Sequence, residues 1–427
     1  MHRIPQQCIR APGFRRAALS RLLAVLVLTG AITSFAFAGV ASAKEYLVGL
    51  LCDRTGPTNP VGLYLCDGFH DYVKLFNSRN GLGAGNSIRV MEIDHAYNVP
   101  RGVEGYERMK AAGIISLFLY GTPHTAALAP KVNEDHLAST TPGFGSAAAA
   151  DGRKFPYLFP AAASYWSQAG GAMQFVMENW KGPGKPKVAY IFGDNPAGRE
   201  PLAVMEDIAA LEGVELRTYA VPPPYIEMRP QVIDITRRFK ADWIVSHLFG
   251  RAPGISLKEF HRMGTPLTRV VGLVWSAAES DIRVAGWDTA EGYYNVQFAF
   301  VGSTGHPLLD DVRALYKSEG KPPPEAMSTS VYYNRGLAAA ALHAEAIRTA
   351  IAAKGINITS VDVKNAMERI KDFSLDDFMA PINMAPDNHE GGGFVRIFQV
   401  HDGGYRPITG WYQGYRDVVL KRLATEG

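Results

Sequence analysis

The stretch LLCDRTGPTNPVGLYLCDGF, residues 50–69, is typical of a β-strand that ends abruptly and is followed at once by a helix. Apolar residues before Asp53 indicate a buried strand, and Leu65 and Phe69 recur at helical spacing. Thr55-Gly56-Pro57 supplies turn-forming residues between the two elements. The stretch therefore predicts the strand–turn–helix unit that opens an α/β sheet.

The same alternation of short apolar runs and helical patterns continues through most of the chain. Strands are predicted at 46–51, 88–93, 114–120, 137–140, 187–192, 215–221, 242–248 and 269–274, with helices between them. The last third departs from this rhythm, with helices near 308–318, 328–353 and 361–370 and strands near 393–400 and 405–411. Repeated βα units imply parallel sheets with helices on both faces, and 427 residues are enough for two such domains.

The first 43 residues differ in composition from the rest of the chain. They hold five arginines and no acidic residue, followed by an apolar run and by Ala41-Ser42-Ala43. This pattern predicts a cleaved secretory signal peptide, with an uncleaved membrane anchor as the alternative. Removing five of the 44 basic residues and none of the 41 acidic ones leaves a formal net charge of −2. Neither a nucleic acid nor an anionic membrane surface is then expected as a partner.

Two cysteines, Cys52 and Cys66, remain once the leader and its Cys8 are removed. Export places them in an oxidising compartment, which favours a disulfide between them, and the alternative is a pair of buried thiols. Two cysteines without clustered histidines do not indicate a metal site.

The residues that directly follow the early strands are the candidates for a binding site, because ligands of open α/β sheets bind at the carboxyl ends of the strands. Three loops stand there, at 53–57, 121–125 and 141–146, and they are rich in hydroxyl groups and glycine. Each leads into a helix start, where free backbone N–H groups can bind a carboxylate. The alternative for any single residue, such as Thr122, is simple helix capping.

Other motifs do not indicate catalysis. The glycine-rich run at 81–85 follows a helix and precedes a strand, so a helix-terminating turn is expected there. Residues 387–390, Asp-Asn-His-Glu, are expected to form a polar turn and not a metal site. No hydrolase elbow, phosphate loop or zinc signature is present in the sequence. The sequence therefore predicts neither an enzyme nor a cofactor.

Several segments, taken in order, resemble one family. They are VGLLCDRTGPTNPVGLYLCDGFHDYVKLFN (48–77), LFLYGTPHTAALAPKVNEDHL (117–137), PYLFPAAASYWSQAGGAMQFV (156–176), STSVYYNRGLAAAALHAEAI (328–347) and VRIFQVHDGGYRPITGW (395–411). Together they are similar to the periplasmic solute-binding proteins of ABC importers, in the branched-chain amino acid and amide-binding group. The resemblance covers the chain from Lys44 to about Arg416.

The resemblance implies the type I periplasmic binding protein fold, in which two doubly wound, Rossmann-like lobes are joined by a three-strand hinge. By chain order the first lobe would comprise 44–161 and 300–380, and the second 162–299 and 381–427. Ligand would be trapped between the lobes by hinge closure. The residues that match the family's ligand-binding positions are Tyr64, Thr122, His124, Thr125, Phe144, Gly145, Ser146, Tyr165, Trp166, Asn195, Phe249, Gly250 and Trp275.

One of these positions departs from the family's pattern. Amino-acid binders of the family place an acidic residue near Trp275 to pair with the ligand ammonium, and this chain reads VWSAA there before Glu279. An ammonium would lose a charge-assisted hydrogen bond, whereas a tryptophan offers an apolar wall. We therefore expect an aromatic or other apolar carboxylic acid ahead of branched-chain amino acids, with amides or urea third. The alternative for these aromatic residues is an ordinary place in the core.

The resemblance also implies partners and a location. The chain would be a monomer in the periplasm that binds a small molecule and delivers it to an ABC permease in the inner membrane. A ligand-sensing receptor module is the alternative from another class, and an exported hydrolase is a more distant one.

Overall fold

The computed structural model describes residues 43–143, 145, 147–276 and 278–426. Residues 1–42 of the predicted signal peptide, Phe144 and Ser146 therefore lie outside the described residues. Residues Lys44–Gly427 form one of the two units into which the chain divides, and the structure below is that of this unit.

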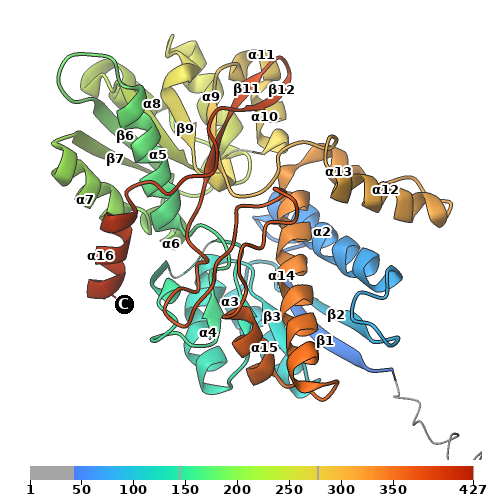
Figure 1. The fold of residues 1–427 in the computed structure, drawn as a ribbon. Helices are drawn as coiled ribbons and strands as arrows, with labels where there is room; N and C mark the ends of the chain where they lie inside the picture. The colour runs from blue at the N-terminus through green and yellow to red at the C-terminus, as the bar shows by residue number, and fades with distance from the viewer. Residues whose placement is uncertain (1–42, 144, 146, 277, 427) are drawn as a thin grey trace, which may run out of the picture. The chain divides into compact units, whose positions relative to one another are not determined.

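The first sheet contains five parallel strands in the order β2-β1-β3-β4-β5 (Figure 1). They are β1 (Glu45–Cys52), β2 (Ser87–Asp94), β3 (Ser116–Phe118), β4 (Ser139–Thr140) and β5 (Leu158–Phe159). Every residue of β1 after the first is buried, as its continuous apolar run predicts for a strand covered on both faces.

Helices cover both faces of the first sheet. Val48 and Leu50 of β1 join the cluster formed with α2 (Asn59–Ser78) and α14 (Val331–Lys354), two helices that pack along each other. The intervening Leu47 and Leu51 point to the opposite face and pack with residues of α3 (Val99–Ala111) and α4 (Thr122–Glu134). This alternation along one strand divides the core of the lobe into two layers.

The second sheet has seven strands in the order β12-β11-β10-β9-β8-β6-β7. They are β6 (Lys187–Gly193), β7 (Glu215–Val221), β8 (Trp243–His247), β9 (Val270–Gly272), β10 (Tyr294–Gln297), β11 (Arg396–His401) and β12 (Gly404–Pro407). The strands β6 to β10 are parallel and repeat the strand order of the first sheet, and β11 and β12 add an antiparallel hairpin at the edge.

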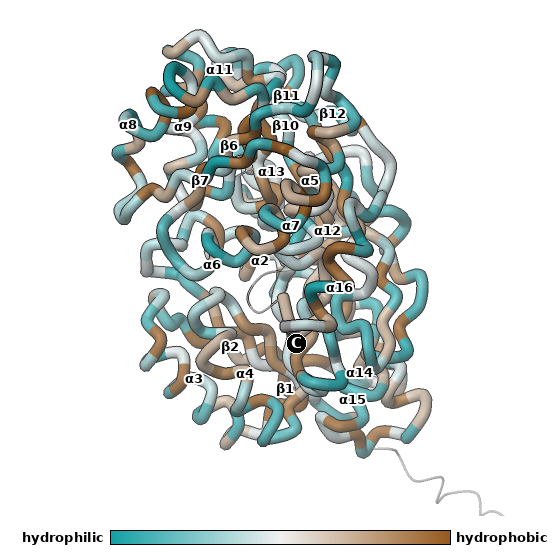
Figure 2. Tube along the Cα trace, turned by 90° about the vertical axis from the view of Figure 1, so that its left-hand side faces the viewer, coloured by the Kyte–Doolittle hydropathy of each residue, from teal (hydrophilic) through white to brown (hydrophobic). Residues whose placement is uncertain are grey.

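Helices also cover both faces of the second sheet. One layer contains α5 (Tyr165–Asn179) and α7 (Leu202–Glu212), and the C-terminal α16 (Arg416–Glu426) packs against both. The other contains α8 (Arg229–Ile233), α9 (Ala252–Arg262) and α10 (Glu279–Ala285). The remaining helices are α6 (Pro196–Arg199), α11 (Trp287–Ala290), α12 (Pro307–Ser318), α13 (Glu325–Thr329) and α15 (Ser360–Met367). In Figure 2, brown and teal stretches alternate along the chain, as expected for elements with one apolar side.

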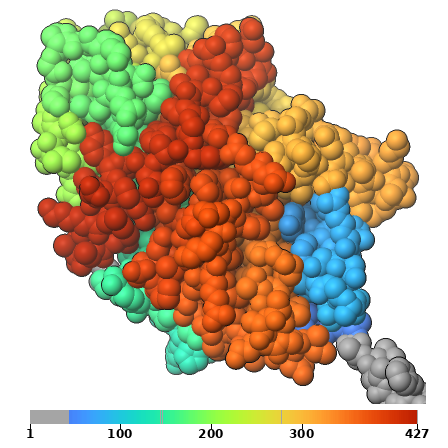
Figure 3. All heavy atoms as spheres, viewed as in Figure 1, coloured from blue at the N-terminus to red at the C-terminus, as the bar shows by residue number. Residues whose placement is uncertain are grey.

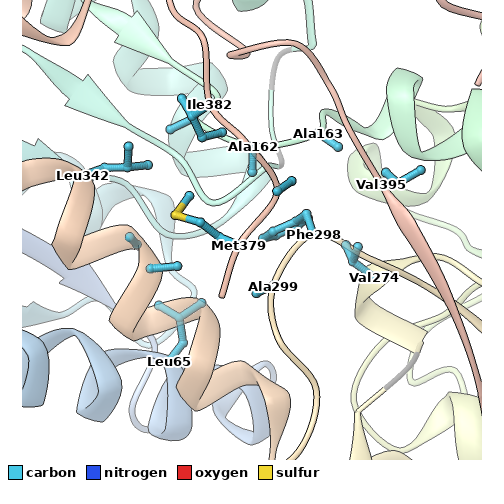
Figure 4. Close-up of a cluster of buried hydrophobic side chains, with 14 of the residues drawn as sticks. Leu65, Ala162, Ala163, Val274, Phe298, Ala299, Leu342, Met379, Ile382 and Val395 are labelled. Carbon is cyan, nitrogen blue, oxygen red and sulfur yellow. The ribbon is translucent and has the colours of Figure 1, made fainter. Parts of the chain in front are cut away.

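Three segments of chain pass between the two lobes. Ala162 and Ala163 lie on the first, Phe298 and Ala299 on the second, and Met379 on the third, and their side chains meet in the buried apolar cluster of Figure 4. Backbone hydrogen bonds join the second and third segments, since Phe300 donates to Phe378 (2.6 Å) and Ala380 donates to Phe298 (2.9 Å).

The third segment remains attached to the first lobe before it enters β11. The backbone N–H of His389 donates to Ala150 (2.9 Å), and the His389 ring stacks on Phe159 with centroids 3.7 Å apart. On the face shown in Figure 3, the red C-terminal chain then runs from the β11–β12 hairpin across to α16.

The fold class predicted from the sequence is confirmed: the chain has two doubly wound α/β lobes of the type I periplasmic binding protein fold. The sequence prediction missed the short strands β5 and β10 and the helices α6, α10, α11 and α16. The single helix predicted over 328–353 divides at Ser330, whose extended backbone and side-chain oxygen cap α14. Two-residue strands such as β4 and β5 are fixed by their neighbours in the sheet and leave little periodicity in the sequence.

Candidate functional site

A pocket lies between the lobes, at the carboxyl ends of strands from both sheets. The empty space in this pocket, with the open space at its mouth included, is about 370 Å³. The first lobe contributes Thr58, Val61, Tyr97, Tyr120, Gly121 and Thr122, and the second contributes Tyr165, Ala197, Phe249, Gly250 and Trp275.

The opening turn of α2 forms one edge of the pocket, and Asp53 at the end of β1 holds that turn in place. One Asp53 carboxylate oxygen accepts from the Gly56 N–H (2.6 Å), and the other accepts from the Thr58 N–H (2.9 Å) and hydroxyl (2.6 Å). Gly56 and Gly62 are required here, because a Cβ at either would lie within 3 Å of backbone atoms. The disulfide between Cys52 and Cys66 joins the end of β1 to α2 just beyond this turn.

Aromatic residues that follow β2 and β3 form the inner part of the pocket wall that the first lobe contributes. The Tyr120 hydroxyl donates to the Thr58 carbonyl (3.1 Å), and the Tyr97 ring meets the Tyr120 ring edge-on at 6.4 Å. Behind them the rings of His95 and His124 stack with centroids 3.8 Å apart. His95 accepts from the Tyr97 N–H (2.9 Å) through Nδ1 and donates to the Tyr120 carbonyl (3.0 Å) through Nε2.

Both histidines are uncharged at neutral pH. Burial and the neighbouring His124 lower the pKa of His95 to about 3, and burial lowers the pKa of His124 below its usual value. For His124 the effect of burial outweighs an opposing contact with the Asn98 backbone, which acts to raise the pKa. The pair therefore supports Tyr97 and Tyr120 as packing and brings no positive charge to the pocket.

The opposite wall comes from strand ends of the second sheet. Phe249 and Gly250 follow β8, and Trp275 follows β9. Ser276 links the two loops, since its hydroxyl contacts both the N–H (2.8 Å) and the carbonyl (2.9 Å) of Leu248. The Tyr165 hydroxyl interacts with the side chains of Thr122 and Trp275, and burial raises its pKa well above the usual value.

The two walls approach each other closely. A Cβ at Gly250 would lie 4.0 Å from the Pro57 carbonyl oxygen of the first lobe, and Gly250 has a positive φ of 62°. Glu200, at the end of α6, accepts a hydrogen bond from the Ala147 N–H of the first lobe (2.5 Å). These contacts close the cleft around a small pocket.

Of the described residues that line the pocket, none carries a charged side chain. Five are aromatic, and hydroxyl groups of threonine and tyrosine are its main side-chain hydrogen-bonding groups. Asp53, the carboxylate behind the Thr58 turn, already accepts three hydrogen bonds from that turn. Such a lining suits a flat or apolar solute with one polar end.

The structure brings five of the residues named from the sequence together in this pocket. They are Thr122, Tyr165, Phe249, Gly250 and Trp275. Gly145 lies next to them, since a Cβ on it would be 3.2 Å from the Thr122 Cα. Glu279, which stands after the Trp275 loop, is directed elsewhere and accepts from the Val331 N–H (2.6 Å).

The other named residues lie behind the pocket lining or away from it. His124 stacks on His95, and the Thr125 hydroxyl donates to Gly121 (3.1 Å) within α4. Tyr64 is partly buried against the core, and Trp166 donates to the Glu200 carbonyl (3.0 Å). Asn195 caps α6 by accepting from the Gly198 N–H (2.9 Å) and donates to the Tyr225 hydroxyl (2.9 Å).

Gly121 stands in the predicted 121–125 loop, and five further lining residues were not named from the sequence: Thr58, Val61, Tyr97, Tyr120 and Ala197. Two of them carried a usable signal. Tyr120 ends the apolar run of β3, and Tyr97 follows β2, so the rule of reading residues after each strand points to both. Thr58 and Val61 belong to the turn and helix start after β1, one step beyond the loop that was considered.

Within the described part of the chain, no group of three or more histidine, cysteine, aspartate or glutamate residues is placed to hold a metal ion. None of the helices described there combines the length and apolar character that crossing a membrane requires.

Comparison with known families decides the identity of the fold. The family model described as "Periplasmic binding protein" matches residues 45–405. The chain belongs to the periplasmic binding protein family. As a member of that family it is a solute-binding protein and not an enzyme. No curated protein matches the chain.

Several solved structures are similar to this periplasmic binding protein. One from the Pseudomonas fluorescens group, titled an ABC transporter permease, is 26% identical with a TM-score of 0.81, over 90% of this chain and 95% of that one. A branched-chain amino acid ABC transporter from Thermus thermophilus with bound valine is 20% identical with a TM-score of 0.76, over 90% of this chain and 100% of that one. A fatty acid ABC transporter substrate-binding protein from Thermomonospora curvata is 17% identical with a TM-score of 0.73, over 88% of this chain and 94% of that one.

Proposed function

We propose that this periplasmic binding protein is the substrate-binding component of an ABC importer and that its ligand is a small carboxylic acid with an aromatic or apolar body. The observation that carries the ligand class is the lining of the pocket: aromatic rings and hydroxyl groups, with no charged side chain among the described lining residues. An aromatic ring buried between Trp275, Phe249 and the tyrosines would gain both apolar contact and ring stacking.

The start of α4 supports a carboxylate as the polar end of the ligand. The first turn of a helix has N–H groups without intrahelical partners, and Thr122 and His124 supply them here, while Pro123 between them has none. The Thr122 side chain lines the pocket beside these groups. Backbone donors and the positive end of the helix dipole favour a negatively charged group at this position.

A branched-chain amino acid is the second candidate, since the Thermus thermophilus structure holds valine. Its ammonium group would need an acceptor, and the nearby Asp53 carboxylate is already bonded to Gly56 and Thr58. The ammonium group of a bound amino acid would have no free carboxylate of the protein to pair with, which would lower the affinity. We therefore rank a carboxylic acid without an ammonium group ahead of an amino acid as the ligand.

The proposal includes the location and movement of the protein. Residues 1–43 would be a signal peptide, and the mature chain would act as a periplasmic monomer that delivers ligand to a permease. The first lobe would comprise 44–161 and 300–380 and the second 162–299 and 381–427, with the third connection reaching about Val395 before it joins the second sheet. Ligand binding would hold the lobes closed.

A thermal-melt screen tests the ligand class. Protein lacking residues 1–43 is unfolded, freed of ligand and refolded, and is then melted with aromatic acids, aliphatic acids, branched-chain amino acids and amides. A ligand at a thousandfold excess over its Kd adds about 4 kcal/mol to the free energy of unfolding, which raises Tm by several degrees. We expect benzoate-like acids to give the largest rise. A rise with leucine or valine alone would show that the ligand is an amino acid.

A further inference from the structure

Arg335 is a buried cation directly behind the aromatic wall of the pocket. It lies on α14, in the second turn, and only 1% of its surface is exposed. Its guanidinium carbon lies 4.8 Å from the ring centre of Trp275, which lines the pocket, and 5.1 Å from the rings of Phe298 and Tyr332. Trp275 therefore lines the pocket while its ring contacts Arg335, which is not among the residues that line the pocket.

The hydrogen bonds of Arg335 fix the loop that carries this indole. Its Nη2 donates to the Val274 carbonyl (2.7 Å) and to the Gln297 side-chain oxygen (2.6 Å). One turn earlier on α14, the Tyr332 hydroxyl donates to the Trp275 carbonyl (3.2 Å). Two side chains of one helix thus hold Val274 and Trp275 from behind.

The charge of Arg335 is not cancelled by an ion pair. No carboxylate oxygen lies within 4.0 Å of its nitrogens among the described residues, and its Nε and Nη1 have no hydrogen-bond partner there. Burial lowers its pKa to about 10, so it remains protonated at neutral pH. Burying an unpaired charge lowers the stability of the folded state, and contacts with aromatic ring faces offset only part of this loss.

The neighbouring acids do not replace an ion pair. Asp281 accepts from the Ala278 N–H (3.1 Å) and the Tyr332 hydroxyl (3.0 Å), and burial raises its pKa to about 7. Glu279 accepts from the Val331 N–H (2.6 Å), and burial raises its pKa as well. Since the described lining of the pocket is uncharged, the charges just behind it shape the potential that a ligand meets, with Arg335 on the Trp275 side and the Asp53 carboxylate behind the Thr58 turn on the opposite side.

We propose that Arg335 is a specificity-determining residue that makes the pocket select an anionic aromatic ligand over its uncharged amide, acting through Trp275. The inference rests on the proposed function and deepens it. The guanidinium draws electron density from the indole ring that it contacts, and its field acts on a ligand in contact with Trp275. A carboxylate gains from that field and a neutral amide of the same shape does not.

The test compares benzoate with benzamide in four purified proteins by calorimetric titration. The wild type is compared with R335M, which removes the charge, and with R335K, which keeps the charge and loses the planar guanidinium group. The matched control is R348M, which removes an exposed arginine of the same helix that pairs with Glu345. The readout is the ratio of the benzamide Kd to the benzoate Kd, which a general loss of packing does not change.

We expect R335M to reduce that ratio about tenfold or more, mainly by weakening benzoate, while R335K keeps most of it and R348M keeps all of it. Equal weakening of both probes in R335M would overturn the role of Arg335 and leave the proposed function standing. Failure of benzoate to bind the wild type would overturn the proposed ligand class instead.

A second measurement follows the indole itself and needs no ligand, so it also covers a variant that binds neither probe. The fluorescence of Trp275 is isolated as the difference between each protein and its W275F derivative. We expect R335M to shift the emission maximum of this difference spectrum by several nanometres and R335K to shift it less. An unchanged spectrum in R335M would overturn the action of Arg335 through Trp275.

Discussion

The two walls of the pocket are built on sheets with the same strand order, yet they are held in different ways. The first-lobe turn is fixed from within its own lobe, since Asp53 bonds to Gly56 and Thr58, the Tyr120 hydroxyl donates to the Thr58 carbonyl and the disulfide spans a separation of 14 residues. The second-lobe wall depends on distant partners. Trp275 and Val274 are held by Tyr332 and Arg335, which are 57 and 61 residues away.

The difference assigns separate tasks to the lobes. The first lobe presents hydroxyl groups and backbone N–H groups from a turn that is rigid by local bonding, which suits recognition of a polar end. The second lobe presents Phe249 and Trp275 on loops tied together by Ser276, which suits an apolar body. Equivalent positions at the ends of equivalent strands have thus taken on different chemistry.

Removing the aromatic wall should have the largest effect on binding. W275A deletes the ring that is nearly fully buried at the pocket, and losses at such central aromatic positions are about 2–4 kcal/mol. We expect the Kd for benzoate to rise by a factor of 30 or more in calorimetric titration. Trp287, half-buried on α11 and outside this pocket, gives the control W287A, which should bind as the wild type does. A rise in the Kd of less than threefold in W275A would show that the Trp275 ring does not determine the affinity for benzoate.

Opening the disulfide should weaken the first lobe in particular. Replacing both Cys52 and Cys66 with serine frees a loop of about 15 residues, which lowers the free energy of unfolding by about 3 kcal/mol in the chain-entropy model. Denaturant unfolding measures the total loss, and hydrogen exchange locates it. Faster exchange in α2 with unchanged exchange in β6 and β8 is expected, and uniform acceleration in both sheets would contradict local stiffening of the first wall.

The smallest effect is expected from a single hydroxyl at the polar wall. T122V keeps the shape of the side chain and removes its hydrogen bond, worth about 1 kcal/mol, so the Kd for benzoate should rise about fivefold. Thr125, one turn along α4, donates to Gly121 and does not line the pocket, so T125V should leave the Kd unchanged. Equal effects of the two substitutions would mean that both act through the stability of α4.

The same difference between the walls explains how much of the site could be predicted. The rule that ligands bind after the strands identified Thr122, because it needs only the order of strands and loops, and the family resemblance added Phe249, Gly250 and Trp275. The rule was not applied after β2, where Tyr97 stands, and the pairing of β2 with β1 and the stacked histidines behind it bring that ring into the pocket. His124 and Thr125 were named because they follow a strand, but helical geometry turns them to the inner side of α4.

The fold was easier to predict than the site. Long, continuously apolar strands such as β1 and β6 can be recognised in the sequence, whereas β4, β5 and β10 are short segments defined by pairing with neighbouring strands. Arg335 could not have been connected with Trp275 from the sequence, because their contact requires the position of α14 relative to the second sheet.

The bonds of the Trp275 loop have a mechanical consequence. The loop is fastened to the second lobe through Ser276 and Leu248 and to α14, which lies along α2 of the first lobe, through Arg335 and Tyr332. A loop that is bonded to both lobes lies near the hinge axis, where rotation of the lobes displaces it least. In the proposed hinge closure, the Trp275 and Phe249 loops, tied together by Ser276, then stay in place as one wall, and the first-lobe turn at Thr58 closes toward them.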